Sequence, residues 1–300
     1  MSAALAALLP LFLVIALGHL LRRAGFPGEG FWRPAERLTY YVLFPALLVL
    51  SLSRAELEGA GAARMAGALA AGVLAMTALL LVLRPRLGVP GPAFTSLYQG
   101  AVRFNTYVGL AATAALLGEA GLGLAAVALA VLVPLVNLLS VTLLARYGSG
   151  GIGLVRAVAG NPLILACAAG IGLRLAEVAP PAAAATLLEL LGRAALPLGL
   201  LAVGAGLDFA AVRQRPGLLA LGLAAKLALM PALVFAACRL LAVPEPASLV
   251  AVLFAALPGA PSAYVLARQL GGDGALMAGL VTGQTAAAVL TLPLVLGLAG

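Results

Sequence analysis

Charged residues are scarce in this sequence. Asp, Glu, Lys and Arg together make up 9% of its 300 residues, whereas they make up about 25% of a typical soluble domain. Hydrophobic residues make up 64% of the chain, and the mean hydropathy is +1.15. Because so few charges cannot cover a water-soluble globule, the composition excludes a soluble protein. It predicts an all-α polytopic membrane protein.

Side chains that hold metals and phosphates are scarce too. The single histidine, His19, rules out an HExxH zinc motif, and the single lysine, Lys226, follows Ala225 rather than the glycine of a phosphate-binding loop. Cys167 and Cys238 lie in apolar runs and are predicted to be core residues without a disulfide or metal. The net charge of +8 is spread over scattered arginines, which argues against a nucleic-acid partner. We expect neither an enzyme nor a cofactor.

Apolar runs separated by glycine, proline and charge predict ten transmembrane helices of about 20 residues each. The first run has no positive residue before it and is followed by Arg22 and Arg23. A signal peptide has the opposite flank, so this run is predicted to be the first membrane helix. The ten predicted ranges are 3–21, 35–53, 62–83, 94–117, 121–145, 161–176, 184–206, 217–241, 247–270 and 275–298.

The arginines predict the orientation of the chain. If successive loops alternate sides, one side carries 11 arginines and the other carries five, while Arg103 and Lys226 lie inside predicted helices. The side with more arginines is expected to face the cytoplasm. Both termini are then predicted to lie outside a bacterial-type inner (plasma) membrane.

The two halves of the chain resemble each other. Five helices per half is an odd number, so residues 1–150 and 151–300 are predicted to be two inverted five-helix repeats, which are typical of secondary transporters. At a shift of 152 residues, the matches are Pro10 with Pro162, Gly18 with Gly170, Arg22 with Arg174, Pro45 with Pro197, and Glu56 with Asp208. At a shift of 154, Gly118-Glu119 matches Gly272-Asp273.

The ninth predicted helix contains a break. Pro258, Gly259 and Pro261 lie within four residues of each other, and prolines remove the backbone donors that a continuous helix needs. At the shift of 154, this break matches the polar stretch 104–107 in the fourth predicted helix. Two interrupted helices at matching positions indicate a transport site. The alternative is a pair of ordinary proline kinks in a structural bundle.

The charges near these breaks favour an anion. All ten acidic residues fall in loops or near predicted helix ends, whereas Arg103 and Lys226 lie within helices. A basic, carboxylate-free interior with helix N-termini suits a small organic anion, such as a carboxylate. Arg103 could instead snorkel to the interface, and Lys226 could bond to backbone carbonyls or take part in coupling. The candidate substrate-binding residues are Arg103, Asn105, Thr106, Tyr107, Lys226, Pro258, Gly259, Ala260, Pro261 and Ser262.

Further polar residues within the spans are more simply explained by interhelical hydrogen bonds. They are Ser96, Gln99, Asn137, Ser140, Thr142, Thr282, Gln284 and Thr285.

Three stretches resemble the auxin efflux carrier (AEC) family of transporters, whose bacterial members are described as malate or malonate permeases. They are the sequence NPLI at Asn161–Ile164, the proline-centred second helix at Pro45, and above all the run from Pro258 to Asp273. The resemblance extends to length, helix count and repeat. It implies that the fourth and ninth helices cross at their unwound centres.

The resemblance also implies two domains. The first, second, sixth and seventh helices would form a panel, and helices three to five and eight to ten a transport domain. Asn105 matches an asparagine common at the family's first crossover. Family members carry a proline after the following Gly-Leu pair, but here Gly109-Leu110 precedes Ala111. The helix-breaking residues are therefore expected to be Gly109, Pro258 and Pro261. A homodimer through the panel is also implied.

The sequence thus predicts a secondary transporter that moves a small organic anion, a dicarboxylate or an auxin-like carboxylate, by alternating access around the crossing. Expected partners are the anion and membrane lipid, and coupling to protons, to sodium or to neither is left open. The alternatives are a sodium-coupled bile-acid-type symporter and a non-transporting bundle that acts as a sensor or assembly partner. A sodium/proton antiporter and an aspartyl intramembrane protease each need carboxylates within the membrane, which the sequence places only near helix ends.

Overall fold

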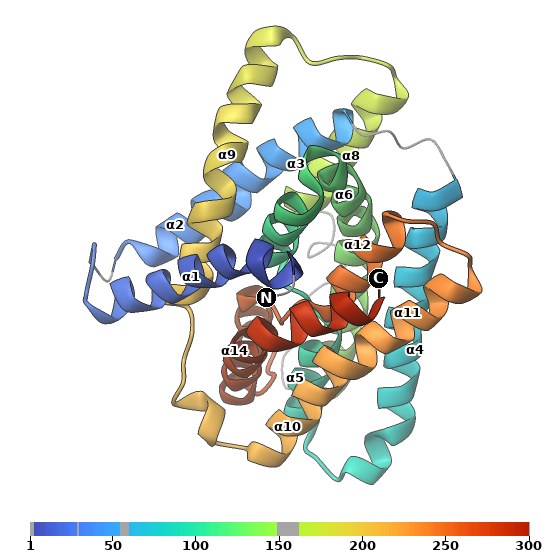
Figure 1. Cartoon of the computed structure of the whole chain (residues 1–300). Helices are drawn as coiled ribbons and strands as arrows, with labels where there is room; N and C mark the ends of the chain where they lie inside the picture. Colours follow the sequence, from blue (N-terminus) through green and yellow to red (C-terminus); the bar gives the residue numbers. More distant parts are fainter. Residues whose placement is uncertain (1–2, 29, 55–59, 149–161, 300) are drawn as a thin grey trace.

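The computed structural model describes residues 3–28, 30–54, 60–148 and 162–299, which form helices and, in these ranges, no strand (Figure 1). Three features predicted from the sequence lie outside the described residues. They are the match of Glu56 with Asp208 between the two repeats, the first residue of the NPLI stretch, Asn161, and most of the loop at residues 148–151 that joins the two halves of the chain.

The first half begins with α1, the first predicted membrane helix. The second predicted helix combines α2, a π-helical segment η1 and α3 in one span. α6 merges the second part of the fourth helix with the fifth, across Gly118 at a φ of 62° that favours glycine. The bounds are α1 Ala3–Arg23, α2 Trp32–Leu38, η1 Thr39–Leu43, α3 Phe44–Ser53, α4 Ala60–Leu87, α5 Gly91–Val102 and α6 Thr106–Tyr147.

The second half has a similar order of elements. A π-helical segment, η3, again interrupts one span between α10 and α11. The bounds are α8 Pro162–Leu175, α9 Ala182–Ala205, the 3₁₀ turn η2 Ala211–Arg213, α10 Pro216–Ala224, η3 Ala225–Leu229, α11 Met230–Leu240, α12 Ala247–Ala256, α13 Pro261–Gln269 and α14 Gly274–Ala299. The predicted helix boundaries agree with these to within a few residues.

Seven helices in the described ranges are long and apolar enough to cross a membrane. The number rises to eight if α12 and α13, which meet at 49°, are counted together as one broken span rather than a re-entrant loop. Two predicted spans are not in this count: 94–117, which is divided by a break and merged into α6, and 161–176, which appears as the shorter helix α8. The structure therefore supports a polytopic membrane protein, and the number ten remains a prediction.

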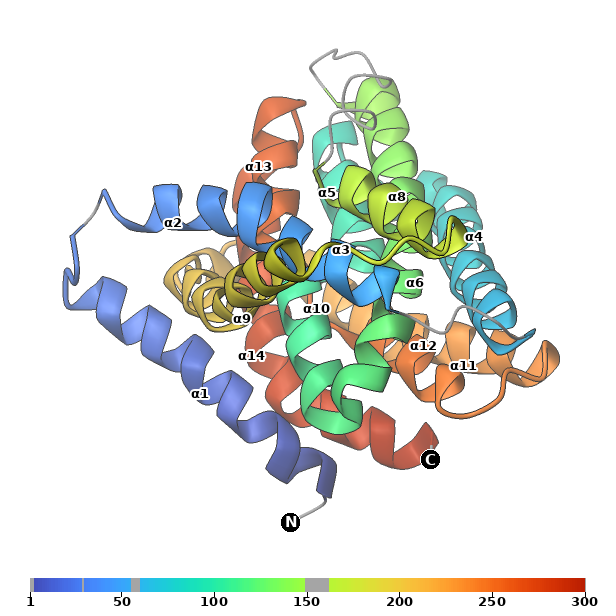
Figure 2. The ribbon, with the colours of Figure 1, turned by 90° about the horizontal axis from the view of Figure 1, so that it is seen from above.

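The helices pack in two groups. α1 packs along α9, and α3 packs against both α8 and α9. Elsewhere α4 packs against α11, and α12 packs against α4, α11 and α14. Figures 1 and 2 show α1, α2 and α9 on one side of the molecule, with α4 and α11 on the opposite side.

Two glycines let α1 and α9 approach closely. A Cβ atom at Gly204 of α9 would overlap the carbonyl oxygen of Ile15, and one at Gly18 of α1 would overlap the carbonyl oxygen of Leu201. Small residues at such crossings allow backbone-to-backbone contact, which is how membrane helices gain packing energy without a hydrophobic driving force. The α1–α9 contact therefore depends on both glycines.

Replacing Gly204 with valine is expected to lower the melting temperature of the detergent-solubilised protein by several degrees, because overpacking costs about 1–3 kcal/mol or more. Gly172→Ala is the matched control, since Gly172 is an exposed helical glycine with nothing within 4 Å of an added Cβ. It should be neutral or slightly stabilising. Equal melting temperatures for Gly204→Val and the parent would contradict the close contact.

Candidate functional site

Two helix breaks meet inside the molecule. α5 ends at Val102 and α6 begins at Thr106, so Arg103–Asn105 are extended between them. α12 ends at Ala256 and α13 begins at Pro261. The backbone N–H of Asn105 donates to the carbonyl of Pro258 at 2.8 Å. The two breaks therefore cross, and one satisfies a backbone group of the other.

The two breaks have different local causes. Pro258 and Pro261 lack N–H groups, so α12 cannot continue through them. The other break has no proline, and there the side chain of Asn105 caps α6 by accepting from the N–H groups of Tyr107 at 3.0 Å and Val108 at 3.3 Å. The predicted break at Gly109 is corrected by this finding, because Gly109 lies within the regular part of α6.

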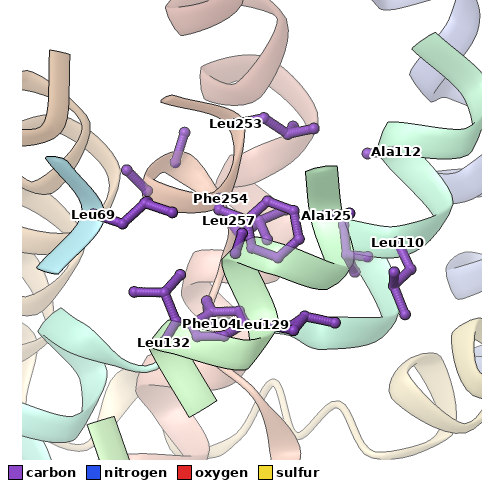
Figure 3. Packing of buried hydrophobic residues seen from close by; sticks show 14 of the residues in the cluster. Leu69, Phe104, Leu110, Ala112, Ala125, Leu129, Leu132, Leu253, Phe254 and Leu257 are labelled. Carbon is purple, nitrogen blue, oxygen red and sulfur yellow. The ribbon is translucent and has the colours of Figure 1, made fainter. Parts of the chain in front are cut away.

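Apolar side chains pack around the crossing. The ring centroids of Phe104 and Phe254 lie 5.7 Å apart. Both rings, with Leu257, lie among leucines of α6 in Figure 3. Gly109 permits this packing, because a Cβ there would lie 2.7 Å from Cδ1 of Leu257. The breaks are thus enclosed by protein, as unpaired backbone inside a membrane requires.

Gln284 of α14 joins three irregular parts of the bundle. Its Oε1 accepts from the N–H of Gly259 at 2.9 Å, and its Nε2 donates to the carbonyls of Gly100 at 2.9 Å and Gly222 at 3.1 Å. Gly100 lies in the last turn of α5, and Gly222 lies just before η3. The side chain is fully buried. One amide therefore bonds to backbone groups of three segments, although the Gly222 carbonyl also accepts from the backbone N–H of Ala225.

A cavity of about 910 Å³ opens beside the crossing. Its wall comes from the α2–η1 region, the break after α5, α6, α8 and the start of α13. The lining residues are Arg33, Pro34, Glu36, Arg37, Tyr40, Tyr41, Arg103, Asn105, Thr106, Tyr107, Asn137, Val141, Leu163, Ala260, Pro261, Ser262, Val265 and Leu266.

Two buried donors in the cavity wall lack a partner. Nη2 of Arg103 lies 3.5 Å from Oγ of Ser262. Nη1 of Arg103 and Nδ2 of Asn105 have no hydrogen-bond partner among the described residues. Arg103 is 9% exposed and Asn105 is 1% exposed. Buried donors without partners are costly, so these groups favour an oxygen-rich ligand that accepts from them.

Aromatic side chains surround these donors. Tyr107 stacks on Phe44, with ring centroids 4.4 Å apart and an angle of 2° between the ring planes. The Tyr98 hydroxyl and Oγ1 of Thr77 lie 3.0 Å apart. Tyr40 and Tyr98 also lie near the guanidinium of Arg103. The guanidinium is therefore held among aromatic rings, away from bulk water.

Most of the predicted substrate-binding residues lie together. Arg103, Asn105, Thr106, Tyr107, Ala260, Pro261 and Ser262 all line the cavity. Pro258 and Gly259 belong to the crossing but are not part of the lining. Lys226 is 1% exposed within η3 and does not line the cavity either. The structure thus places the second basic candidate apart from the first.

The expectation of a carboxylate-free interior is corrected by Glu36. The second span begins at Trp32, three residues before the predicted start, so Glu36 lies on α2 and contributes to the cavity wall. Arg33 and Arg37 line the same cavity from α2, and both are exposed. Sequence reasoning assigned these three residues to a loop or helix end because charge interrupts the apolar run there.

The chain is similar to known transporters. The model of the Sodium Bile acid symporter family matches residues 194–299. A protein of Rhizobium meliloti (strain 1021) named "Putative malonate transporter" is 28% identical over 279 residues, covering 88% of this chain and 85% of the relative. Both matches are to transporters rather than enzymes. Together with the apolar helices, they support an integral membrane protein with a transport function.

Proposed function

We propose that this chain is a secondary transporter for a small organic anion, a dicarboxylate or an auxin-like carboxylate, which binds in the cavity beside the crossed breaks. The unpartnered donors of Arg103 and Asn105 are the observation that carries the proposal. A carboxylate has only acceptor oxygens, and it would satisfy both donors.

The helix termini at the site add to this preference for an anion. α6 begins at Thr106 and α13 begins at Pro261, and both residues line the cavity. The N-terminal end of a helix carries a partial positive charge and N–H groups outside the helical pattern. The name of the Rhizobium meliloti relative supports a dicarboxylate such as malonate.

The architecture that we propose is two inverted five-helix repeats with a panel and a transport domain, of the auxin efflux carrier type. The packing of two matched glycines supports the repeat. Gly18 of α1 contacts Leu201 of α9, while Gly170 of α8 contacts Leu52 of α3, and the two glycines are 152 positions apart. In this proposal the crossing moves against the panel of α1, α2, α3, α8 and α9 to expose the anion alternately on each side.

The orientation and assembly also belong to the proposal. Arg33 and Arg37 line the cavity, and the sequence predicts them on the arginine-rich side, so the cavity would open toward the cytoplasm and both termini would lie outside. A homodimer through the panel is proposed on the resemblance alone.

A second candidate is a sodium-coupled bile-acid-type symporter. The match of residues 194–299 to that family favours it. The two functions differ in their driving ion and substrate. Taurocholate uptake into proteoliposomes that requires an inward sodium gradient would favour this candidate over a carboxylate carrier.

Asn105→Asp tests the proposed site with little disturbance of the fold. Aspartate caps a helix as well as asparagine does, so the bonds to Tyr107 N and Val108 N can remain. The change removes the free Nδ2 donor and adds a negative charge beside the ligand. We expect saturable malonate uptake to fall at least about tenfold, which corresponds to about 1.4 kcal/mol, with a nearly unchanged melting temperature. Undiminished uptake in Asn105→Asp would argue against anion binding here.

A further inference from the structure

Glu36 is a carboxylate in the wall of a cavity that suits an anion. Its side chain is half-buried and makes no hydrogen bond or ion pair within the described part of the chain. It lies within electrostatic reach of Arg33, three residues earlier on the same helix, and of Tyr107. Tyr107 lies two residues after Asn105, and Glu36 lines the same cavity as the unpartnered donors of Asn105 and Arg103.

The cavity holds little buried positive charge to balance Glu36. Of the three arginines in its wall, Arg103 is buried, whereas Arg33 and Arg37 are exposed, and exposed charges are screened more strongly than buried ones. Arg103 and Glu36 form no ion pair with each other. An anion bound at Arg103 would therefore add a second negative charge near Glu36. The single buried guanidinium would then have to balance both negative charges.

Two carboxylates that share a poorly hydrated site do not both remain ionised at low cost, and one of them binds a proton. We infer that Glu36 is a proton-binding site linked to the anion site, so that binding of the anion is accompanied by uptake of a proton at Glu36. This inference rests on the proposed function of the cavity.

The other charged and titratable groups around Glu36 do not replace it in this role. On its own span these are Arg33, Arg37, Tyr40 and Tyr41, and from α6 and the break they are Tyr107 and Arg103. α9 also packs against α2. Its charged residues, Glu189 and Arg193, pair with each other at 2.7 Å on the surface. Arginines keep their protons and the tyrosine hydroxyls remain neutral near pH 7, which leaves Glu36 as the carboxylate of the cavity wall.

The direction of the linkage follows from the signs of the charges. A protonated Glu36 no longer repels the anion, so affinity for the anion should increase as the pH falls. By reciprocity, the anion increases the proton affinity of the site by the same factor. A neutral glutamine at this position should bind the anion as the protonated protein does, at every pH.

The experiment uses the purified full-length protein, with malonate as the probe. Proton uptake on addition of malonate is followed with an indicator dye in weakly buffered detergent solution, and the malonate dissociation constant is measured between about pH 6.5 and about pH 8.5. The variants are Glu36→Gln, the shorter but titratable Glu36→Asp, and the surface control Glu189→Gln. Melting temperatures confirm that each variant is folded.

We expect the parent, Glu36→Asp and Glu189→Gln to take up protons with malonate and to bind it severalfold more tightly at the acidic end. Glu36→Gln should bind malonate without proton uptake and without pH dependence. Binding by Glu36→Gln with undiminished proton uptake would overturn the inference and leave the proposed function intact. Failure of the parent protein to bind malonate or indole-3-acetate at either pH would overturn the proposed function and this inference together.

Discussion

Replacing Arg103 with glutamine is expected to lower the apparent affinity for malonate in uptake by about 30-fold to about 5,000-fold. Arg103 is the buried cation of the cavity wall, and one of its N–H groups has no partner among the described residues. Losing one side of a buried, hydrogen-bonded charge pair costs about 2–5 kcal/mol. The measurement is the concentration dependence of radiolabelled malonate uptake into proteoliposomes.

Two variants show whether this loss comes from the site. Arg103→Lys keeps the charge but not the planar fork of donors, so it should retain part of the uptake. Arg193→Gln removes an exposed arginine whose partner is Glu189 on the same helix, and uptake should be unaffected. If Arg103→Gln transported malonate with the affinity of the parent, the guanidinium would not be a ligand.

Replacing Gln284 with leucine is expected to lower both the melting temperature and the transport rate severely. Leucine has a similar size but leaves the N–H of Gly259 and the carbonyls of Gly100 and Gly222 without this partner. Each buried backbone group left unpaired costs about 1–3 kcal/mol. The crossing and the segment before η3 should lose their fixed positions together.

A second variant separates the contribution of the acceptor, Oε1 of Gln284, from that of the donor, Nε2, and a third serves as a control. Gln284→Glu in its ionised form keeps the acceptor for Gly259 but cannot donate to either carbonyl. Thr142→Val is the control, because Thr142 is an exposed threonine that bonds only to the carbonyl one turn earlier. Thermal unfolding and uptake are measured for each. A Gln284→Leu protein as stable and active as the Thr142→Val control would contradict the proposal that Gln284 holds the three segments together.

Sequence reasoning works well where the cause of a structure is local. The break in the ninth helix follows from Pro258 and Pro261, which cannot donate to any helix. The apolar runs locate the described spans closely, because the membrane requires about 20 apolar residues per helix. Cys167 and Cys238 are buried, as predicted.

Sequence reasoning fails where the residues that cause a local structure lie far away in the sequence. The polar stretch 104–107 predicts the position of the break at Arg103–Asn105 through its match with the other break. It does not predict that Asn105, rather than Gly109, ends the irregular segment by capping α6, nor the hydrogen bond from Asn105 to Pro258, more than 150 residues later. Gln284 was predicted only to make an interhelical hydrogen bond, since nothing local indicates its partners 25, 62 and 184 residues away. Glu36 lies near the start of the second predicted helix, and the sequence does not indicate that it shares a cavity with Arg103 and Ser262.

An anion that occupies the cavity at the crossed breaks should protect a thiol placed in the cavity wall. Ser262 lines that cavity next to Arg103, and both native cysteines are buried, so Ser262→Cys provides a site for a membrane-impermeant thiol reagent. Gly217→Cys, at an exposed position with nothing within 4 Å of an added Cβ, is the control. The account predicts that saturating malonate slows modification of Ser262→Cys at least about tenfold and leaves Gly217→Cys unchanged. If malonate is transported but leaves the modification rate of Ser262→Cys unaltered, the anion binds elsewhere and the account is contradicted.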